Sequence, residues 1–463
     1  MGLRYADLFS DTIPVDTSHS KVVRVNRVII IGNKITRDHI IARELSVKPG
    51  DTINLQKLSI QLIRDRERVY NLRLFNTVSL RTLELSPDTV DLLVEVTERW
   101  YTFPVPIFEL SDRNFNEWWQ TYNHDFSRIN YGIRLYQYNF RGRNETLRLT
   151  AQFGFTRNFE LIYRIPNLDR QQKHGLTFAF DFSEPKNLAY FTENHKLSFL
   201  RLRETLRETL GGGISYSFRR SFYETHTFSA TYRDSHVSDT IVSLNPNYYK
   251  YNSTSQRFGT VSYQFVSDHR DVMAYPLKGF RFSAFISQVG LGLSDDANQL
   301  ELNVTHAQHF DLGKNYYLSN FSSIYLSSPS DQPYSLFGAL GYQKQFIRGY
   351  ELNVIEGPWY VLNKTTFKKK IFSRNWNLDG VTIEQFQYFP LTIYLKTYAD
   401  FGYVENYPLY EENQFNQELS NRFLLGGGLG IDMVTVYDTV LRFEYSITRE
   451  GARGFFFHAK KEF

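Results

Sequence analysis

The sequence predicts an all-β transmembrane barrel of about 16 antiparallel strands, preceded by one small α/β domain. Three observations lead to this prediction. Aromatic residues make up 16% of the 463 residues, with 39 Phe and 32 Tyr. The mean hydropathy is −0.40, and no run of about 18 apolar residues marks a transmembrane helix. From Trp100 onward, segments of about ten residues alternate between apolar and polar side chains.

The composition argues against several classes of site and function. The chain has no cysteine, which excludes disulfides, thiolate metal sites and a lipid anchor on an N-terminal cysteine. A net charge of +4 over 463 residues argues against a dedicated nucleic-acid binder. Residues 1–21 are polar and lack the basic start and apolar core of a signal peptide. We expect them to form a flexible leader, with the signal peptide absent from this chain.

Residues 22–98 show the pattern of a small α/β domain. An apolar strand ends at Gly32-Asn33, and Thr36 is a plausible N-cap for a first helix. Pro49-Gly50 breaks the chain before a second helix. Two strands follow, from Phe75 to Leu83 and from Val90 to Val96. The apolar residues that share one face of the second helix are Leu55, Leu58, Leu62, Ile63 and Val69.

The order β-α-α-β-β, the sequence Ile31-Gly32-Asn33 and the step Leu72-x-x-Phe75-x-x-Val78 resemble a POTRA domain. The resemblance implies a periplasmic module that binds a client peptide by adding its strand to an open sheet edge. The alternative is a domain that only positions the barrel. We expect a single copy.

Residues 99–463 are predicted to form the barrel, because the helical period disappears and the alternation recurs in sixteen segments. An even number is typical of bacterial single-chain barrels. A long polar stretch at about 327–359 interrupts the pattern. The segments begin near Trp100, Ile129, Glu145, Phe159, His174, Glu208, His226, Arg257, Gly279, Gln299, Asn315, Tyr360, Leu391, Arg422, Val440 and Gly454.

The long stretch contains the motif Ile347-Arg348-Gly349-Tyr350. About fifty residues later, alternation along a strand places Asp400 on the polar, lumen-facing side, two residues before Gly402. An arginine fork on a carboxylate in a narrow lumen is charge-assisted and can be bidentate. The alternative for an isolated Arg-Gly-Tyr is an exposed loop arginine.

The first and last predicted strands carry further signals. Phe455, Phe457 and the terminal Phe463 share one face, which resembles the outer-membrane β-signal, although Lys460 stands where many signals have glycine. In the first strand, Pro104 and Pro106 both lack an N–H on the same edge. They either weaken the junction with the last strand or belong to a linker between the two domains.

Together these motifs resemble the BamA-type superfamily of outer-membrane assembly and translocation barrels. The resemblance implies that the long loop folds into the pore and that Arg348 pairs with Asp400. It also implies a lateral seam between first and last strands. The expected function is insertion or translocation of client outer-membrane or exported polypeptides, without nucleotide hydrolysis. Expected partners are these clients, the lipid bilayer and accessory periplasmic or lipoprotein subunits, with no nucleic acid.

Several alternatives stay open. Within the superfamily they are a dedicated secretion pore, which usually carries two POTRA domains and a plug helix, and a lipid-trafficking barrel. From another class they are a passive channel and a barrel enzyme. The sequence shows no catalytic motif, no cofactor motif and no metal spacing, His306 and His309 being the nearest approach. The expected location is the outer membrane of a Gram-negative bacterium with the POTRA domain in the periplasm, ahead of an organelle outer membrane.

Overall fold

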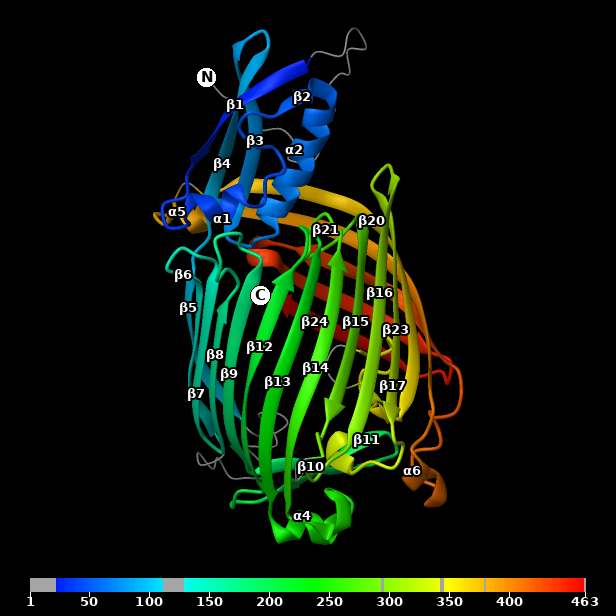
Figure 1. Cartoon of the computed structure of the whole chain (residues 1–463). Helices are drawn as coiled ribbons and strands as arrows, with labels where there is room; N and C mark the ends of the chain where they lie inside the picture. Colours follow the sequence, from blue (N-terminus) through cyan, green and yellow to red (C-terminus); the bar gives the residue numbers. More distant parts are fainter. Residues whose placement is uncertain (1–21, 111–128, 293–294, 342–344, 379, 462–463) are drawn as a thin grey trace.

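The computed structural model describes residues 22–110, 129–292, 295–341, 345–378 and 380–461 (Figure 1). The predicted flexible leader lies outside these residues. The N-terminal domain has a four-stranded sheet in the order β2-β1-β4-β3, with β1 parallel to β4. Its elements are β1 (Val22–Ile31), α1 (Asp38–Ala42), β2 (Thr52–Asn54), α2 (Leu55–Tyr70), β3 (Phe75–Ser86) and β4 (Thr89–Glu98).

Within this domain the structure adds the short strand β2 to the predicted order and corrects two details. The N-cap of α1 is Arg37, while Thr36 donates its N–H and hydroxyl to the Glu98 carboxylate. Leu55 and Ile63 are exposed rather than buried. The buried face of α2 instead includes Asp65, whose carboxylate accepts hydrogen bonds from the N–H and hydroxyl of Ser46.

Most of the described residues after β4 form one sixteen-stranded sheet that curls into a barrel, with β5 and β24 at its two ends (Figure 1). Every neighbouring pair is antiparallel, and each of the sixteen predicted segments overlaps an observed strand, which confirms the predicted fold class. The strands are β5 (Thr102–Leu110), β6 (Ile129–Phe140), β7 (Glu145–Gly154), β8 (Thr156–Ile165), β9 (His174–Pro185), β12 (Arg207–Arg219), β13 (Glu224–Val237), β14 (Ser255–Asp268), β15 (Gly279–Val289), β16 (Gln299–Gly313), β17 (Tyr316–Ser328), β20 (Trp359–Asn377), β21 (Tyr388–Val404), β22 (Leu424–Val434), β23 (Thr439–Thr448) and β24 (Arg453–Lys461).

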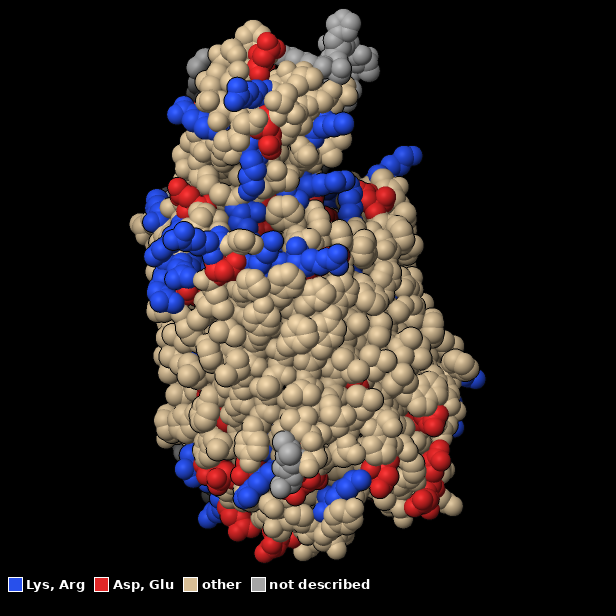
Figure 2. Space-filling view, in the orientation of Figure 1, with Lys and Arg blue, Asp and Glu red and all other residues tan. Residues whose placement is uncertain are grey.

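The outer wall of the barrel is apolar. Figure 2 shows a broad band without Lys, Arg, Asp or Glu in the middle of the visible wall, between charged rims at either end. The strands contribute exposed apolar side chains to this wall, and an outward apolar band is the surface that a membrane barrel presents to lipid. Among the described residues, no helix is long and apolar enough to cross a membrane. Wall residues include Ile133, Leu149, Phe153, Leu161, Phe178, Phe180, Ile214, Phe228, Val261 and Ile286.

The two ends of the barrel differ. At the end near the N-terminal domain, β6 and β7 are joined by residues 141–144, and the carbonyl of Gly142 accepts a hydrogen bond from Arg37 N. The opposite end carries the hairpin β10 (Asn187–Glu193)–β11 (Lys196–Arg201), α4 (Asp239–Leu244), η2 (Lys250–Asn252) and α6 (Pro408–Glu412) (Figure 1). We call these segments the distal cap. Their buried cluster includes Leu188, Leu206, Ile241, Tyr248, Tyr249, Tyr334, Phe337, Tyr407 and Tyr410.

His195, at the turn of the β10–β11 hairpin, joins three parts of this end. Its ring nitrogen Nε2 accepts a hydrogen bond from Leu419 N at 2.9 Å, and its carbonyl accepts one from Val354 N at 2.8 Å. Its own N–H donates to Asn416 Oδ1 at 2.9 Å. Burial lowers the pKa of His195 to about 4, which keeps the imidazole neutral and able to accept.

We predict that this junction weakens in acid. The folded pKa of about 4 lies below the ordinary value of 6.5, so the stabilisation is complete above pH 6.5. It is lost as the pH falls from 6.5 toward 4, by about 3 kcal/mol at most. Hydrogen exchange of the amides of Leu419 and Val354 between pH 7 and 4 measures the loss, after correction for intrinsic exchange rates. A His195→Gln variant lacks the pH step. A flat protection profile in the unaltered protein would contradict the assignment.

Candidate functional site: the lumen loop and the barrel seam

Residues 329–358, which connect β17 to β20, form what we call the lumen loop. It contains η3 (Tyr334–Leu336), β18 (Ala339–Leu340) and β19 (Ile355–Glu356). Ile347 and Tyr350 are buried in a cluster with side chains of β20, β21 and β22. On β21, Tyr398 and Asp400 are buried while Leu395 and Phe401 are exposed on the outer wall. The loop therefore packs against the inner face of the barrel.

Arg348 and Asp400 meet on that inner face. Arg348 Nε donates to Asp400 Oδ2 at 2.8 Å, its Nη2 donates to Oδ1, and its backbone N–H donates to Oδ2 at 3.1 Å. The guanidinium also lies 3.9 Å from the centre of the Tyr398 ring. The arginine is 6% exposed and the aspartate 2%. Because this bidentate ion pair is shielded from solvent, its attraction is strong and holds the loop on β21.

Further charges extend this contact across the neighbouring strands. Glu444 of β23 lies 3.7 Å from Arg348 Nη1 and 2.8 Å from Lys396 Nζ of β21. Lys396 also pairs with Asp432 of β22. All of these side chains are buried. The predicted site did not include Lys396, Asp432 or Glu444, although each is a charged residue at an inward position of an alternating strand.

Small residues let the loop backbone approach the wall. Gly349 has a φ of +102°, which disfavours any other residue. A Cβ on Gly402 would lie 2.6 Å from Ile347 Cδ1, and a Cβ on Gly426 would lie 1.9 Å from the Arg348 carbonyl oxygen. The Tyr350 hydroxyl donates to Glu450 and to the Leu425 carbonyl. The whole predicted motif thus lies against β21, β22 and the end of β23.

The loop also contacts the last strand. The ring of Phe346 stacks on that of His458 in β24, with centres 5.5 Å apart. His458 Nε2 lies 3.9 Å from Glu351 Oε1 and 3.6 Å from Glu444 Oε2. One ligand atom from each of these three residues lies within 4.8 Å of the others. Because Glu444 Oε1 already pairs with Lys396, we interpret the group as a polar contact between loop and β24.

Pro104 and Pro106 lie inside β5, opposite Leu135 and Ile133 of β6, rather than in a linker. Tyr138 N donates to Tyr101 O at 2.8 Å. Bonded and non-bonded pairs alternate in an antiparallel ladder. The register therefore directs the backbone groups of odd-numbered β5 residues toward β6 and those of even-numbered residues away from it. Both prolines consequently remove an N–H from the outer edge of β5.

The same reasoning applies to β24. Thr448 N donates to Ala452 O, so even-numbered residues of β24 bond to β23 and odd-numbered residues, Phe455 and Phe457 among them, direct their backbone groups outward. Their side chains are 86% and 58% exposed.

Phe463 lies outside the described residues. Within those residues no ladder joins β5 to β24, although Phe103 contacts Tyr437, just before β23, at 5.7 Å between ring centres. We call these facing edges the seam.

We predict that Arg348→Ala and Asp400→Ala each destabilise the loop by about 3–5 kcal/mol, because each change leaves a buried charge without its main partner. The double variant should lose less than the sum of the two. Limited proteolysis and hydrogen exchange of residues 345–358 measure the effect. Arg374→Ala, at an exposed arginine of β20, is the matched control. Normal loop protection in both single variants would show that the pair does not hold the loop.

Comparison with known proteins identifies relatives of the N-terminal domain and of the fold. Residues 23–99 match the family model described as "POTRA: Surface antigen variable number repeat". A search of the curated proteins finds no match to the sequence. The solved structures that resemble the chain include BamA from Haemophilus ducreyi lacking POTRA domains 1–3, at 13% identity and a TM-score of 0.53, covering 95% of this chain and 84% of that one. CdiB from Escherichia coli aligns at 9% identity and a TM-score of 0.54, covering 94% of this chain and 76% of that one. The chain therefore carries a POTRA domain at residues 23–99 and has the fold of the BamA-type outer-membrane barrels.

Proposed function

We propose that this protein inserts or translocates client polypeptides at a bacterial outer membrane, with client strands pairing at the seam. The observation that carries the proposal is the pair of strand edges, β5 and β24, that no ladder joins within the described residues. In hydrocarbon, each unsatisfied backbone group costs several kcal/mol. A client strand would satisfy those groups, so the seam supplies both the site and the driving force.

The two edges differ in what they offer a client. Pro104 and Pro106 remove two donors from the outer edge of β5, whereas every outward position of β24 retains its N–H, because that strand has no proline. A strand that pairs with β24 can therefore form a more complete ladder than one that pairs with β5. We propose β24 as the first template for the client.

The POTRA domain supplies a second open strand edge, close to the barrel mouth that it adjoins. In the sheet order β2-β1-β4-β3, the twelve-residue β3 lies at one edge, and the opposite edge is covered only by the three-residue β2. Leu83 and Leu85 at the end of β3 are exposed. An open edge of this length accepts an extended peptide by strand addition. We propose that a client docks on β3 before it reaches the seam.

The lumen loop braces the wall beside the template. It bonds to β21 through Arg348 and Asp400, contacts β23 through Glu444, and contacts β24 through Phe346 and His458. These contacts support the wall at β24, while within the described residues the outer edges of β5 and β24 make no ladder with each other.

The distal cap favours sideways release over passage straight through the barrel. Its tyrosine-rich cluster joins β10, α4, the lumen loop and α6 across the far end, and Tyr407 and Tyr410 are fully buried in it. A secretion pore or passive channel requires this cap to open. Insertion through the seam leaves it closed.

Photo-crosslinking in native outer membranes tests the proposal. A photoreactive residue at Phe457 of β24 is expected to capture polypeptides of several different masses. The same residue at Phe367, an exposed wall position on β20, is the matched control and should capture none. The chain contains no cysteine, so a cysteine-directed crosslinker at these two positions provides an independent repeat.

The adducts separate the candidate functions. One adduct mass at Phe457 indicates a dedicated secretion partner, and lipid adducts alone indicate lipid traffic. If Phe457 captures no polypeptide while the purified barrel shows a large constitutive conductance in planar bilayers, the protein is a passive channel and the proposal is wrong.

A further inference from the structure

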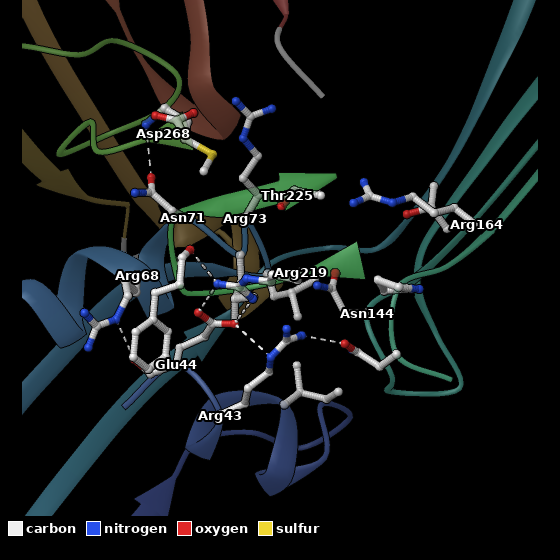
Figure 3. A pocket seen from close by; sticks show the side chains of 18 of the residues that line it. Arg43, Glu44, Arg68, Asn71, Arg73, Asn144, Arg164, Arg219, Thr225 and Asp268 are labelled. Carbon is white, nitrogen blue, oxygen red and sulfur yellow. Dashed lines mark hydrogen bonds and ion pairs between the residues drawn. The ribbon is translucent and has the colours of Figure 1, made fainter. Parts of the chain in front are cut away.

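A large cavity of about 1030 Å³ lies between the POTRA domain and the adjacent mouth of the barrel (Figure 3). Its walls come from α1, α2 and the segment after α2 on one side. On the other side they come from β7, β8, β9, β12, β13 and β14, at the ends of these strands that lie nearest the POTRA domain. Arg219 of β12 forms a bidentate ion pair with Glu44, and Met273 N donates to Asn71 Oδ1, so both halves are held together.

The lining of this cavity is strongly basic. It contains nine Lys and Arg residues but only four Asp and Glu residues. Three of the four carboxylates form ion pairs, Glu44 with Arg219, Asp268 with Arg270 and Asp438 with Arg99. Arg68 pairs with Asp65, which lies outside the lining. The lining cations outnumber the four lining carboxylates and Asp65 together by four. The cationic residues are Arg43, Arg64, Arg68, Arg73, Arg99, Arg164, Lys173, Arg219 and Arg270.

Several of these cations converge on the open space. In Figure 3, the guanidinium groups of Arg73 and Arg164 and the side chain of Thr225 lie around the same open volume. Arg164 and Lys173 have no ion-pair partner among the described residues. Arg43 lies 4.0 Å from Glu44, whose two oxygens already bind Arg219. Burial, and after it the charge of Arg219, lower the pKa of Arg43 to about 10.

We propose that this cavity binds a ligand that carries two or more phosphate groups. A phosphate monoester carries about −1.5 to −2 charges at neutral pH, so two or three of them neutralise the excess in a small volume. Arginine forks bind phosphate oxygens bidentately. Thr225 and Asn144 supply further hydrogen-bond donors around the cavity.

A phosphate ligand fits better than an acidic client segment. A peptide would need four or five adjacent carboxylates, spread over a stretch that spans up to about 13 to 18 Å when it is fully extended. The ligand could come from free polyphosphate or from the phosphorylated headgroup of a lipid, and both share this chemistry. The inference does not depend on client insertion, because binding can be measured on the isolated full chain.

Isothermal titration of the full chain in a neutral detergent with inorganic tripolyphosphate tests the site. We expect one bound molecule per chain, with an affinity that falls as salt rises. Arg164→Gln combined with Lys173→Gln should weaken binding by about tenfold or more, and Arg164→Lys should retain most of it. The matched control is Arg157→Gln combined with Lys196→Gln, which changes the same residue types on β8 and on the β10–β11 hairpin. Heat-modifiable gel mobility verifies that each variant is folded.

Two further arms identify the source and the class of the ligand. Phosphatidylcholine vesicles with and without a bis-phosphorylated glycolipid report headgroup binding, which tripolyphosphate should displace if a lipid is the source. Binding of tripolyphosphate alone indicates a soluble ligand. The proposal is overturned if neither probe binds, if the control variant weakens binding as much as the cavity variant, or if a polyglutamate peptide binds as tightly as tripolyphosphate.

Discussion

The ion pair between Arg348 and Asp400 is the interaction on which the arrangement of the barrel interior depends. Both groups are almost fully buried, and a buried charge is tolerated only when a partner and hydrogen bonds compensate its lost hydration. The pair therefore specifies where the loop must sit. From that anchor, Ile347 packs beside Gly402, and the loop reaches Glu444 of β23 and His458 of β24. One contact on β21 thus sets the environment of the last two strands.

At the seam, by contrast, backbone hydrogen-bonding groups lack ladder partners within the described residues. Elsewhere in the sheet each strand has two hydrogen-bonded neighbours, whereas β5 and β24 each have one within the described residues. Two prolines remove N–H donors from the outer edge of β5. A hydrogen-bonded ladder between β5 and β24, which would close the barrel, is therefore weakened. In the function that we propose, this braced wall lies beside an edge where an incoming strand gains hydrogen bonds that β5 and β24 do not make with each other within the described residues.

Local patterns in the sequence predicted most of the fold. The sixteen strands, the inward position of Asp400 and the shared edge of Pro104 and Pro106 all follow from a period of two residues, which is local. The error at Leu55 and Ile63 arose because apolar spacing could not show that Asp65 turns inward to bond Ser46. The basic cavity was also missed, since Arg43, Arg164 and Arg219 lie on elements far apart in the sequence. Only the docking of the POTRA domain on the barrel brings them together.

The central claim of the proposed function is that a client strand enters at the seam between β5 and β24. Paired cysteines, one in β5 and one in β24, can lock it, and the chain has no native cysteine to interfere. The decisive measurement is client insertion by the oxidised and then reduced protein in proteoliposomes, for several pairs chosen between 102–108 and 453–457. The account predicts that oxidation blocks insertion and that reduction restores it. Full insertion by a barrel whose seam is quantitatively locked would contradict it.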